Sequence, residues 1–272
     1  MSGYVSNGCV DADVVAQAQL CMQEGKVSSL RYGQGSPFFD IVLPCGGAIE
    51  LLVFPIFDTL PLQNACRLLR QRQRVTLVFD TAQNQLTCQA ADTCQGWNEQ
   101  RFRVSCSPKP RIRVVGQGAS FMAVAHLGIE SGFEIIAQSP SQEELAQLEI
   151  AGAISCDHLS SPQQPPVCKD DKWTAVLMLF HDHDWEVSLI LETLKKDAFF
   201  IGAMGSTKTQ HARIEALTEA GVSTHDLSRI TGPLGLVPSL RDAKQIAIST
   251  LAQVVNVSAT QSLPVQVLPQ LA

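Results

Sequence analysis

Two cysteines beside glycines are the first residues in this chain whose types could do chemistry: Cys9 closes the segment NGC, and Cys45 lies in PCGG. Cys9 directly precedes a predicted helix, and a helix N-terminus favours the thiolate form of cysteine. A thiolate suits a soft metal centre, so Cys9 is a candidate metal ligand. The glycines let a ligand approach the backbone, which makes Cys9, Cys45, Gly46 and Gly47 candidate cofactor contacts. The alternative is two small, buried, unreactive thiols.

A glycine turn, GQG, connects a predicted strand to a predicted helix and makes Gly116 and Gly118 candidate cofactor-binding residues. Glycines here let the backbone approach a phosphate, and the helix N-terminus supplies unpaired N–H groups. The dinucleotide fingerprint GxGxxG is incomplete, because Phe121 occupies its third glycine position. No acidic residue ends the following strand, which closes on Gln138 and Ser139. The turn therefore favours a Rossmann-like fold that does not bind NAD.

A second glycine segment, FFIGAMGSTK, carries another set of candidate cofactor-binding residues: Gly202, Gly205, Ser206 and Lys208. A buried strand is predicted to end here and a helix to begin. Ligands bind outside the carboxyl ends of the strands in open parallel sheets. Backbone N–H groups with a lysine nearby suit an anion such as phosphate. The alternative is that Ser206 only caps its helix.

The segment HDHD follows the predicted strand TAVLMLF and begins with His181, another candidate cofactor contact. Histidine and carboxylate at the end of a strand could bind a metal or transfer a proton. Neighbouring residues in an extended segment point in opposite directions, which does not favour a site with two histidines. The alternative is that Asp184 caps the next helix.

Composition excludes several classes of protein. The net charge of −6, without a basic block, argues against nucleic-acid binding. No long apolar run predicts a membrane span, and the N-terminus does not resemble a signal peptide. Nine cysteines without a CxxC pair argue against a disulfide framework and a zinc ribbon. These features favour a cytoplasmic protein with free thiols.

The first part of the chain is predicted to be a small α/β domain. Apolar residues recur on one face of residues 11–24, and Gly25 ends that pattern. The predicted helices are 11–24 and 62–71. The predicted strands are 38–43, 48–54, 75–79 and 86–90, the last two pairing as a hairpin.

A linker is predicted at the segment SPKP, residues 107–110, because it contains two prolines and cannot be helical. Strands and helices then alternate regularly, which predicts a parallel sheet with helices on both faces. The predicted strands are 111–115, 133–137, 154–156, 174–180 and 198–203. The predicted helices are 119–131, 141–151, 185–195, 207–220 and 239–257, the last opened by a capping box from Ser239 to Asp242. We therefore expect domains at 1–107 and 108–257 and a flexible tail at 258–272.

These segments together resemble the XdhC/CoxI family, the accessory proteins of xanthine dehydrogenase and related molybdenum hydroxylases. The matching segments are SNGCVDADVV, LPCGGAIELLV, VVGQG, FHDHDWE, FFIGAMGSTKTQHARIEAL and GPLGLVPSLRDAKQIAISTLAQVV. The resemblance implies an α/β N-terminal domain, here without its first strand, and a Rossmann-like C-terminal domain. Family members commonly carry an acidic residue where Gln138 and Ser139 stand here.

The resemblance also implies a function: binding molybdenum cofactor, protecting it while a terminal sulfur is installed, and inserting it into an apo-enzyme. The implied partners are a cysteine desulfurase and an apo molybdenum hydroxylase. The cofactor, molybdopterin or its dinucleotide form, carries a phosphate that suits a helix N-terminus and a soft metal centre that suits a thiolate. The sequence leaves open which form is bound and whether the chain forms a homodimer.

Two other functions are compatible with the sequence. One is an NAD(P)-dependent oxidoreductase that uses the Rossmann-like domain, against which Phe121 and the missing acidic residue argue. The other is a scaffold that binds protein partners without a cofactor. No catalytic triad or pair of carboxylates is visible, so a carrier is favoured over a hydrolase.

Overall fold

The computed structural model describes residues 3–5, 10–36, 47–91, 94–180 and 185–260. The chain divides into two compact units, one ending at Pro108 and the next beginning at Lys109. No helix among the described residues is long and apolar enough to cross a membrane.

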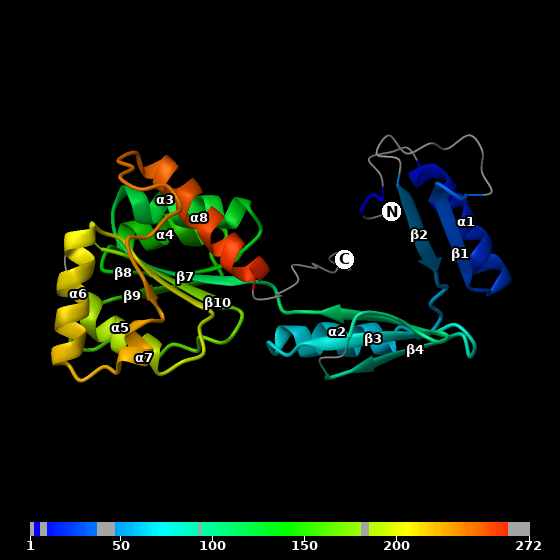
Figure 1. The fold of residues 1–272 in the computed structure, drawn as a ribbon, viewed down its shortest axis with the longest axis horizontal. Helices are drawn as coiled ribbons and strands as arrows, with labels where there is room; N and C mark the ends of the chain where they lie inside the picture. Colours follow the sequence, from blue (N-terminus) through cyan, green and yellow to red (C-terminus); the bar gives the residue numbers. More distant parts are fainter. Residues whose placement is uncertain (1–2, 6–9, 37–46, 92–93, 181–184, 261–272) are drawn as a thin grey trace. The chain divides into compact units, whose positions relative to one another are not determined.

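The second unit is built on a six-stranded sheet with the strand order β12-β11-β10-β7-β8-β9 (Figure 1). Every neighbouring pair of these strands is parallel. The predicted Rossmann-like parallel sheet is thereby confirmed. Its strands are β7 (Arg111–Gly116), β8 (Glu134–Ser139), β9 (Ser155–His158), β10 (Thr174–Leu179), β11 (Phe200–Ala203) and β12 (Ile230–Thr231).

The sheet separates two hydrophobic cores, and β10 shows why. All six of its residues are buried, and successive side chains of a strand point to opposite faces. Leu177 and Leu179 therefore join the core beneath α3, α4 and α8, whereas Val176 and Met178 join the core beneath α5 and α6. Figure 1 shows these helices on the two sides of the sheet. Their bounds are α3 (Ala119–Glu130), α4 (Gln142–Ala151), α5 (Glu186–Leu194), α6 (Thr207–Glu219), α7 (Thr224–Leu227) and α8 (Ala243–Thr260).

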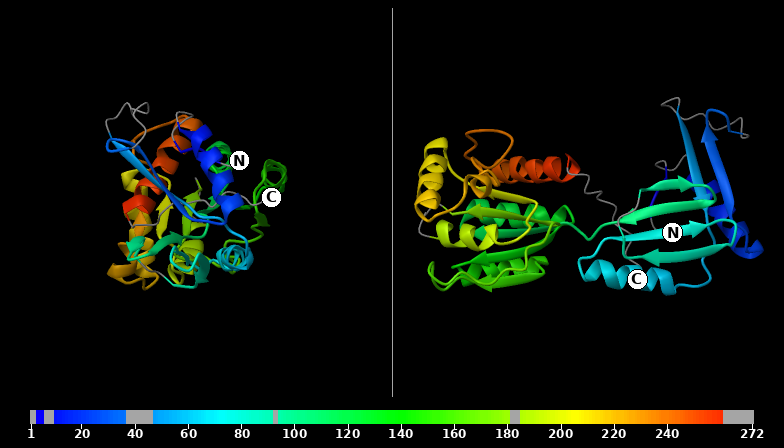
Figure 2. Two further views of the ribbon diagram at one scale, coloured as in Figure 1. Left: turned by 90° about the vertical axis from the view of Figure 1, so that its right-hand side faces the viewer. Right: turned by 60° about the horizontal axis from the view of Figure 1, so that its bottom comes forward.

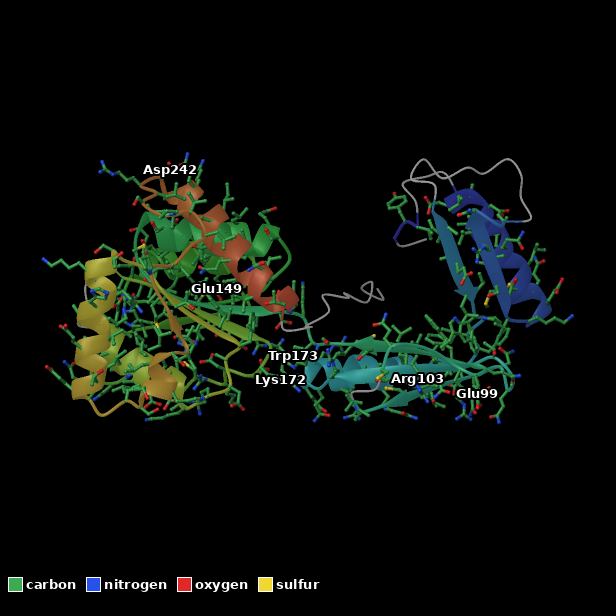
Figure 3. All side chains as sticks on the ribbon, viewed as in Figure 1. Glu99, Arg103, Glu149, Lys172, Trp173 and Asp242 are labelled. Atoms are coloured by element: carbon green, nitrogen blue, oxygen red, sulfur yellow. The ribbon has the colours of Figure 1, made fainter. Side chains whose placement is uncertain are left out.

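The start of α8 differs from its prediction. The carboxylate of Asp242 accepts the backbone N–H groups of Lys244 and Gln245, each at 3.0 Å, so Asp242 itself is the N-cap. Ser239 lies outside the helix with a φ of +61°. Figure 3 labels Asp242 at this end of α8. The predicted capping box from Ser239 was therefore wrong by three residues, and the helix continues past residue 257 to Thr260.

The first unit contains a four-stranded antiparallel sheet in the order β4-β3-β6-β5. Its strands are β3 (Val75–Asp80), β4 (Gln85–Gln89), β5 (Gly96–Asn98) and β6 (Arg101–Cys106), and α2 (Leu60–Arg70) lies along one face (Figure 2). Ala65 and Leu68 of α2 pack there against Val75 and Leu77. The predicted hairpin of β3 and β4 is present, whereas β5 and β6 were not predicted.

A two-stranded antiparallel ribbon of β1 (Ser28–Gly33) and β2 (Ala48–Val53) accompanies α1 (Asp11–Glu24) in the same unit. Tyr32 is fully buried beside Val10 and Leu30, and its hydroxyl donates to Asp13 at 2.7 Å. Burial and this hydrogen bond raise the pKa of Tyr32 far above its usual value. The predicted strand at 38–43 lies outside the described residues.

Candidate functional site

The loops that follow β7, β11 and β12 lie at the carboxyl edge of the parallel sheet. The strand order reverses between β7 and β10, which are neighbours although β8 and β9 lie between them in the chain. Such a switch point is where open α/β sheets bind ligands. Gly116 and Gly118 lie in the loop after β7, and Gly205, Ser206 and Lys208 lie after β11. The structure therefore brings two of the predicted glycine segments to one edge of one unit.

The two glycines of the first turn have different roles. A Cβ atom on Gly116 would lie 2.4 Å from the backbone oxygen of Leu179 at the end of β10, so only glycine fits there. Gly118 has a φ of +85°, which favours glycine. Apart from its two chain neighbours, no atom of the described residues lies within 4 Å of a Cβ placed on Gly118. The second glycine therefore borders open space at the start of α3.

A carboxylate that the sequence analysis missed occupies this turn. The Gly118 N–H donates to Oε1 of Glu144 at 2.8 Å, and the Ser139 hydroxyl donates to Oε2 of Glu144 at 3.3 Å. Glu144 lies in the first turn of α4, three residues after the N-cap Ser141. The pattern SxxE at 141–144 was the available signal, because a glutamate at that position reaches back towards the turn before its helix.

The residues at the end of β8 are buried and hydrogen-bonded within the protein. Gln138 accepts from Nη1 of Arg113 at 3.0 Å, and Arg113 forms a bidentate ion pair with Asp170 at 2.9 and 2.6 Å. Both charged side chains are only 2% exposed. Gln138 therefore completes a buried network around an arginine, and its side chain is not free to bind a ribose.

The second turn carries a helix cap. The Ser206 hydroxyl accepts the N–H of Thr209 at 3.1 Å, so Ser206 is the N-cap of α6. A Cβ on Gly205 would lie 2.6 Å from Cγ2 of Thr209, and one on Gly202, inside β11, would lie 2.4 Å from Cδ1 of Leu234. The absence of a side chain at these two glycines therefore leaves room for the side chains of Thr209 and Leu234. Lys208 is exposed and has no ion-pair partner among the described residues.

A buried ion pair holds the second turn in place. Nε and Nη2 of Arg213 on α6 donate to the carboxylate of Glu186 on α5 at 2.9 and 3.0 Å. Nη2 of Arg213 also donates to the backbone oxygen of Met204 at 2.7 Å. Glu186 lies in the first turn of α5, soon after the HDHD segment. The pair therefore joins α6 and Met204, in the loop before it, to the start of α5.

Four predicted site residues, Cys9, Cys45, Gly46 and His181, lie outside the described residues. Gly47 belongs to the first unit, and its carbonyl accepts the N–H of Gln34 at 3.3 Å. No group of three or more His, Cys, Asp or Glu side chains in the described ranges could hold a metal ion.

Seven cysteines are described, and all are free thiols. Burial raises the pKa of four of them, which favours the neutral thiol over the thiolate. These four are Cys88, Cys106, Cys156 and Cys168. The deprotonation that metal binding requires is therefore harder for these four thiols.

Comparisons with known proteins agree with this architecture. Residues 112–254 match the family model described as the XdhC Rossmann domain. The chain is 33% identical over 255 residues to the molybdenum cofactor insertion chaperone PaoD of Escherichia coli K12, covering 94% of this chain and 74% of that protein.

A solved structure from Bacillus halodurans, described as a xanthine dehydrogenase, has the same fold. The TM-score is 0.73 at 19% identity, over 97% of this chain and 85% of that one. The matched domain lies within the second unit, and the relative extends the match over nearly the whole chain. On these grounds the chain belongs to the XdhC family.

Proposed function

We propose that this protein binds molybdenum cofactor and delivers it to an apo molybdenum hydroxylase of the xanthine dehydrogenase type. The observation that carries the proposal is the 33% identity, over 94% of the chain, to a protein named a molybdenum cofactor insertion chaperone. The cofactor is cargo that the protein releases, so the site must bind it firmly but reversibly.

The carboxyl edge of the second unit suits the anionic part of this cargo. The cofactor carries a phosphate, and helix N-termini bind phosphate through unpaired N–H groups. α6 begins at this edge, and its first turn carries the exposed Lys208. We assign the phosphate to the turn from Gly205 to Lys208, because the Gly118 N–H is already bonded to the carboxylate of Glu144.

The metal end of the cargo requires softer contacts. A dithiolene-bound molybdenum suits thiolate ligands, and the four described thiols with raised pKa values are neutral. Cys9 and Cys45 remain the proposed contacts, with Cys9 as the metal ligand. In this role the protein protects the cofactor while a cysteine desulfurase supplies its terminal sulfur.

The test is the cofactor content of the protein purified from molybdenum-replete cells. Molybdenum is measured by mass spectrometry and pterin by fluorescence after oxidation. We expect both in roughly equal amounts, and we expect Lys208→Ala to lower them and to make cofactor retention less sensitive to salt, because salt screens the attraction between the lysine and the phosphate. Lys26→Ala removes an exposed lysine of the first unit and should change nothing. A parent protein without molybdenum and pterin would contradict the proposal.

A further inference from the structure

The carboxylate of Glu144, in the first turn of α4, lies in the turn after β7. Its hydrogen bond is not the one that a glutamate at this helix position usually forms. In a capping box, the glutamate three residues after the N-cap bonds the N–H of the N-cap residue. Here the Ser141 N–H donates instead to Oγ of Ser139 at 3.1 Å. The carboxylate of Glu144 is thereby left to bond the Gly118 N–H at 2.8 Å. Glu144 thus faces the glycine turn at the switch point of the sheet.

The hydrogen-bonding capacity of Glu144 is only partly used. An ionised carboxylate accepts about four hydrogen bonds and donates none. In the structure, the Glu144 carboxylate accepts hydrogen bonds from the Gly118 N–H and from the Ser139 hydroxyl. One acceptor position on each oxygen remains for a ligand. A phosphate is negatively charged and would be repelled, whereas two neighbouring N–H or O–H donors would fit.

A second, independent observation comes from Ser120 in the first turn of α3. Ser120 is only 8% exposed. Its hydroxyl has no hydrogen-bond partner among the residues that the structure describes. Its Oγ is not among the enclosed, unpartnered side-chain atoms of the described residues, so solvent or a ligand can reach it. A ligand bound at the start of α3, where Ser120 lies two residues after Gly118, would offer this hydroxyl a partner.

We propose that Glu144 is a specificity-determining residue that recognises a pair of neighbouring hydrogen-bond donors on the cargo, with Ser120 as a second contact. This inference rests on the proposed function. Two parts of the cargo have such a pair: the ring N–H and amino group of the pterin, and the vicinal hydroxyls of a ribose in the dinucleotide form. Carboxylates bind ribose hydroxyls at this edge of other Rossmann-type sheets, so Glu144 replaces the acidic residue that is missing at Gln138 and Ser139.

The experiment compares Glu144→Gln with the parent. Glutamine keeps the shape and an oxygen for the Gly118 N–H but loses the charge and one acceptor. Glu143→Gln is the matched control, because it removes the same charge from the same turn of α4 at an exposed position. Ser120→Ala is the second variant, and it should fold normally because none of the described residues forms a hydrogen bond with the hydroxyl. The probes are 6-methylpterin, which has no hydroxyl groups on its side chain, the four ribonucleoside monophosphates and their 2′-deoxy counterparts, titrated by calorimetry.

We expect Glu144→Gln to weaken binding of one probe class by about tenfold or more, as for a charged hydrogen bond, and Ser120→Ala to weaken it several-fold. If the ribose is the donor, the parent prefers a ribonucleotide to its 2′-deoxy form, and Glu144→Gln removes the preference. If the pterin is the donor, only 6-methylpterin binding falls. The inference is overturned if the parent binds no probe, or if both variants bind like the parent. In either case a parent that still carries molybdenum and pterin leaves the proposed function intact.

Discussion

Arg213 and Glu186 form a bidentate ion pair that is 1% exposed on each side. The arginine lies on α6, and the glutamate lies in the first turn of α5. Because Arg213 also bonds the Met204 carbonyl, the pair fixes the loop before α6 against the start of α5. One buried charge pair therefore joins α6 and Met204, in the loop before it, to the start of α5.

Breaking this pair should be costly. Glu186→Gln or Arg213→Met alone leaves a buried charge without its partner, which typically costs about 3–5 kcal/mol of the free energy of unfolding. The double variant Glu186→Leu/Arg213→Met removes both charges and should lose clearly less than the two single losses added together. Denaturant unfolding of the four proteins measures this difference. Additive losses would contradict the account, because they would mean that the two side chains act independently.

The acid stability of the first unit should depend on Asp80. The Gln83 N–H and then the Arg101 guanidinium lower the pKa of this carboxyl below its usual value. A group whose pKa is lower in the folded state stabilises the fold above its unfolded pKa, and this contribution is lost as the pH falls through the folded pKa. In thermal unfolding from pH 6 to pH 2, the melting temperature of the parent should therefore fall more steeply below about pH 4 than that of Asp80→Asn. If the melting temperatures of the two proteins fell in parallel with pH, Asp80 would have no such role in acid stability.

The sequence predicted the second unit better than the first. The strand 174–180 could be recognised because β10 is buried on both faces and reads as an unbroken apolar run. β6 alternates between arginine and apolar or small residues and lies next to a short strand of three residues. Its position in the sheet follows from pairing with β3, which no local pattern shows.

The candidate site shows a second limit of local patterns. The fingerprint places an acidic residue at the end of the second Rossmann strand, where this chain has Gln138 and Ser139. Glu144 supplies a carboxylate to the same turn from five residues further on, because the Ser139 hydroxyl bonds the Ser141 N–H and frees the glutamate. That exchange of hydrogen bonds depends on three-dimensional contacts between α4 and the turn after β7.

The two cysteines of the proposed metal contact can be separated from thiols with structural roles. We expect Cys9→Ser, and to a smaller degree Cys45→Ser, to lower the molybdenum content without changing the melting temperature. A ligand affects binding, whereas a buried small residue affects stability. Cys94→Ser is the control, since Cys94 is an exposed free thiol. Unchanged molybdenum content with a lowered melting temperature would show that the thiols only pack.

Nicotinamide cofactors should bind weakly. Phe121 is fully buried at the third position of the fingerprint, and Glu144 would repel a pyrophosphate at the Gly118 N–H. Fluorescence titration with NAD(H) and NADP(H) should therefore give dissociation constants well above about 1 µM, or about −8 kcal/mol. A micromolar or tighter constant would favour the alternative of an NAD(P)-dependent oxidoreductase.

Delivery of the cofactor is the central claim, and a transfer assay tests it most directly. The protein is purified with its cargo, mixed with an apo molybdenum hydroxylase, and the activity of the hydroxylase is followed with time. An equal amount of free cofactor and the protein purified from molybdenum-starved cells are the controls. We predict that the loaded protein activates the apo-enzyme faster and to a higher final activity than free cofactor does, while its own molybdenum content falls. Retention of the molybdenum by the protein, with no activation of the hydroxylase, would contradict the account.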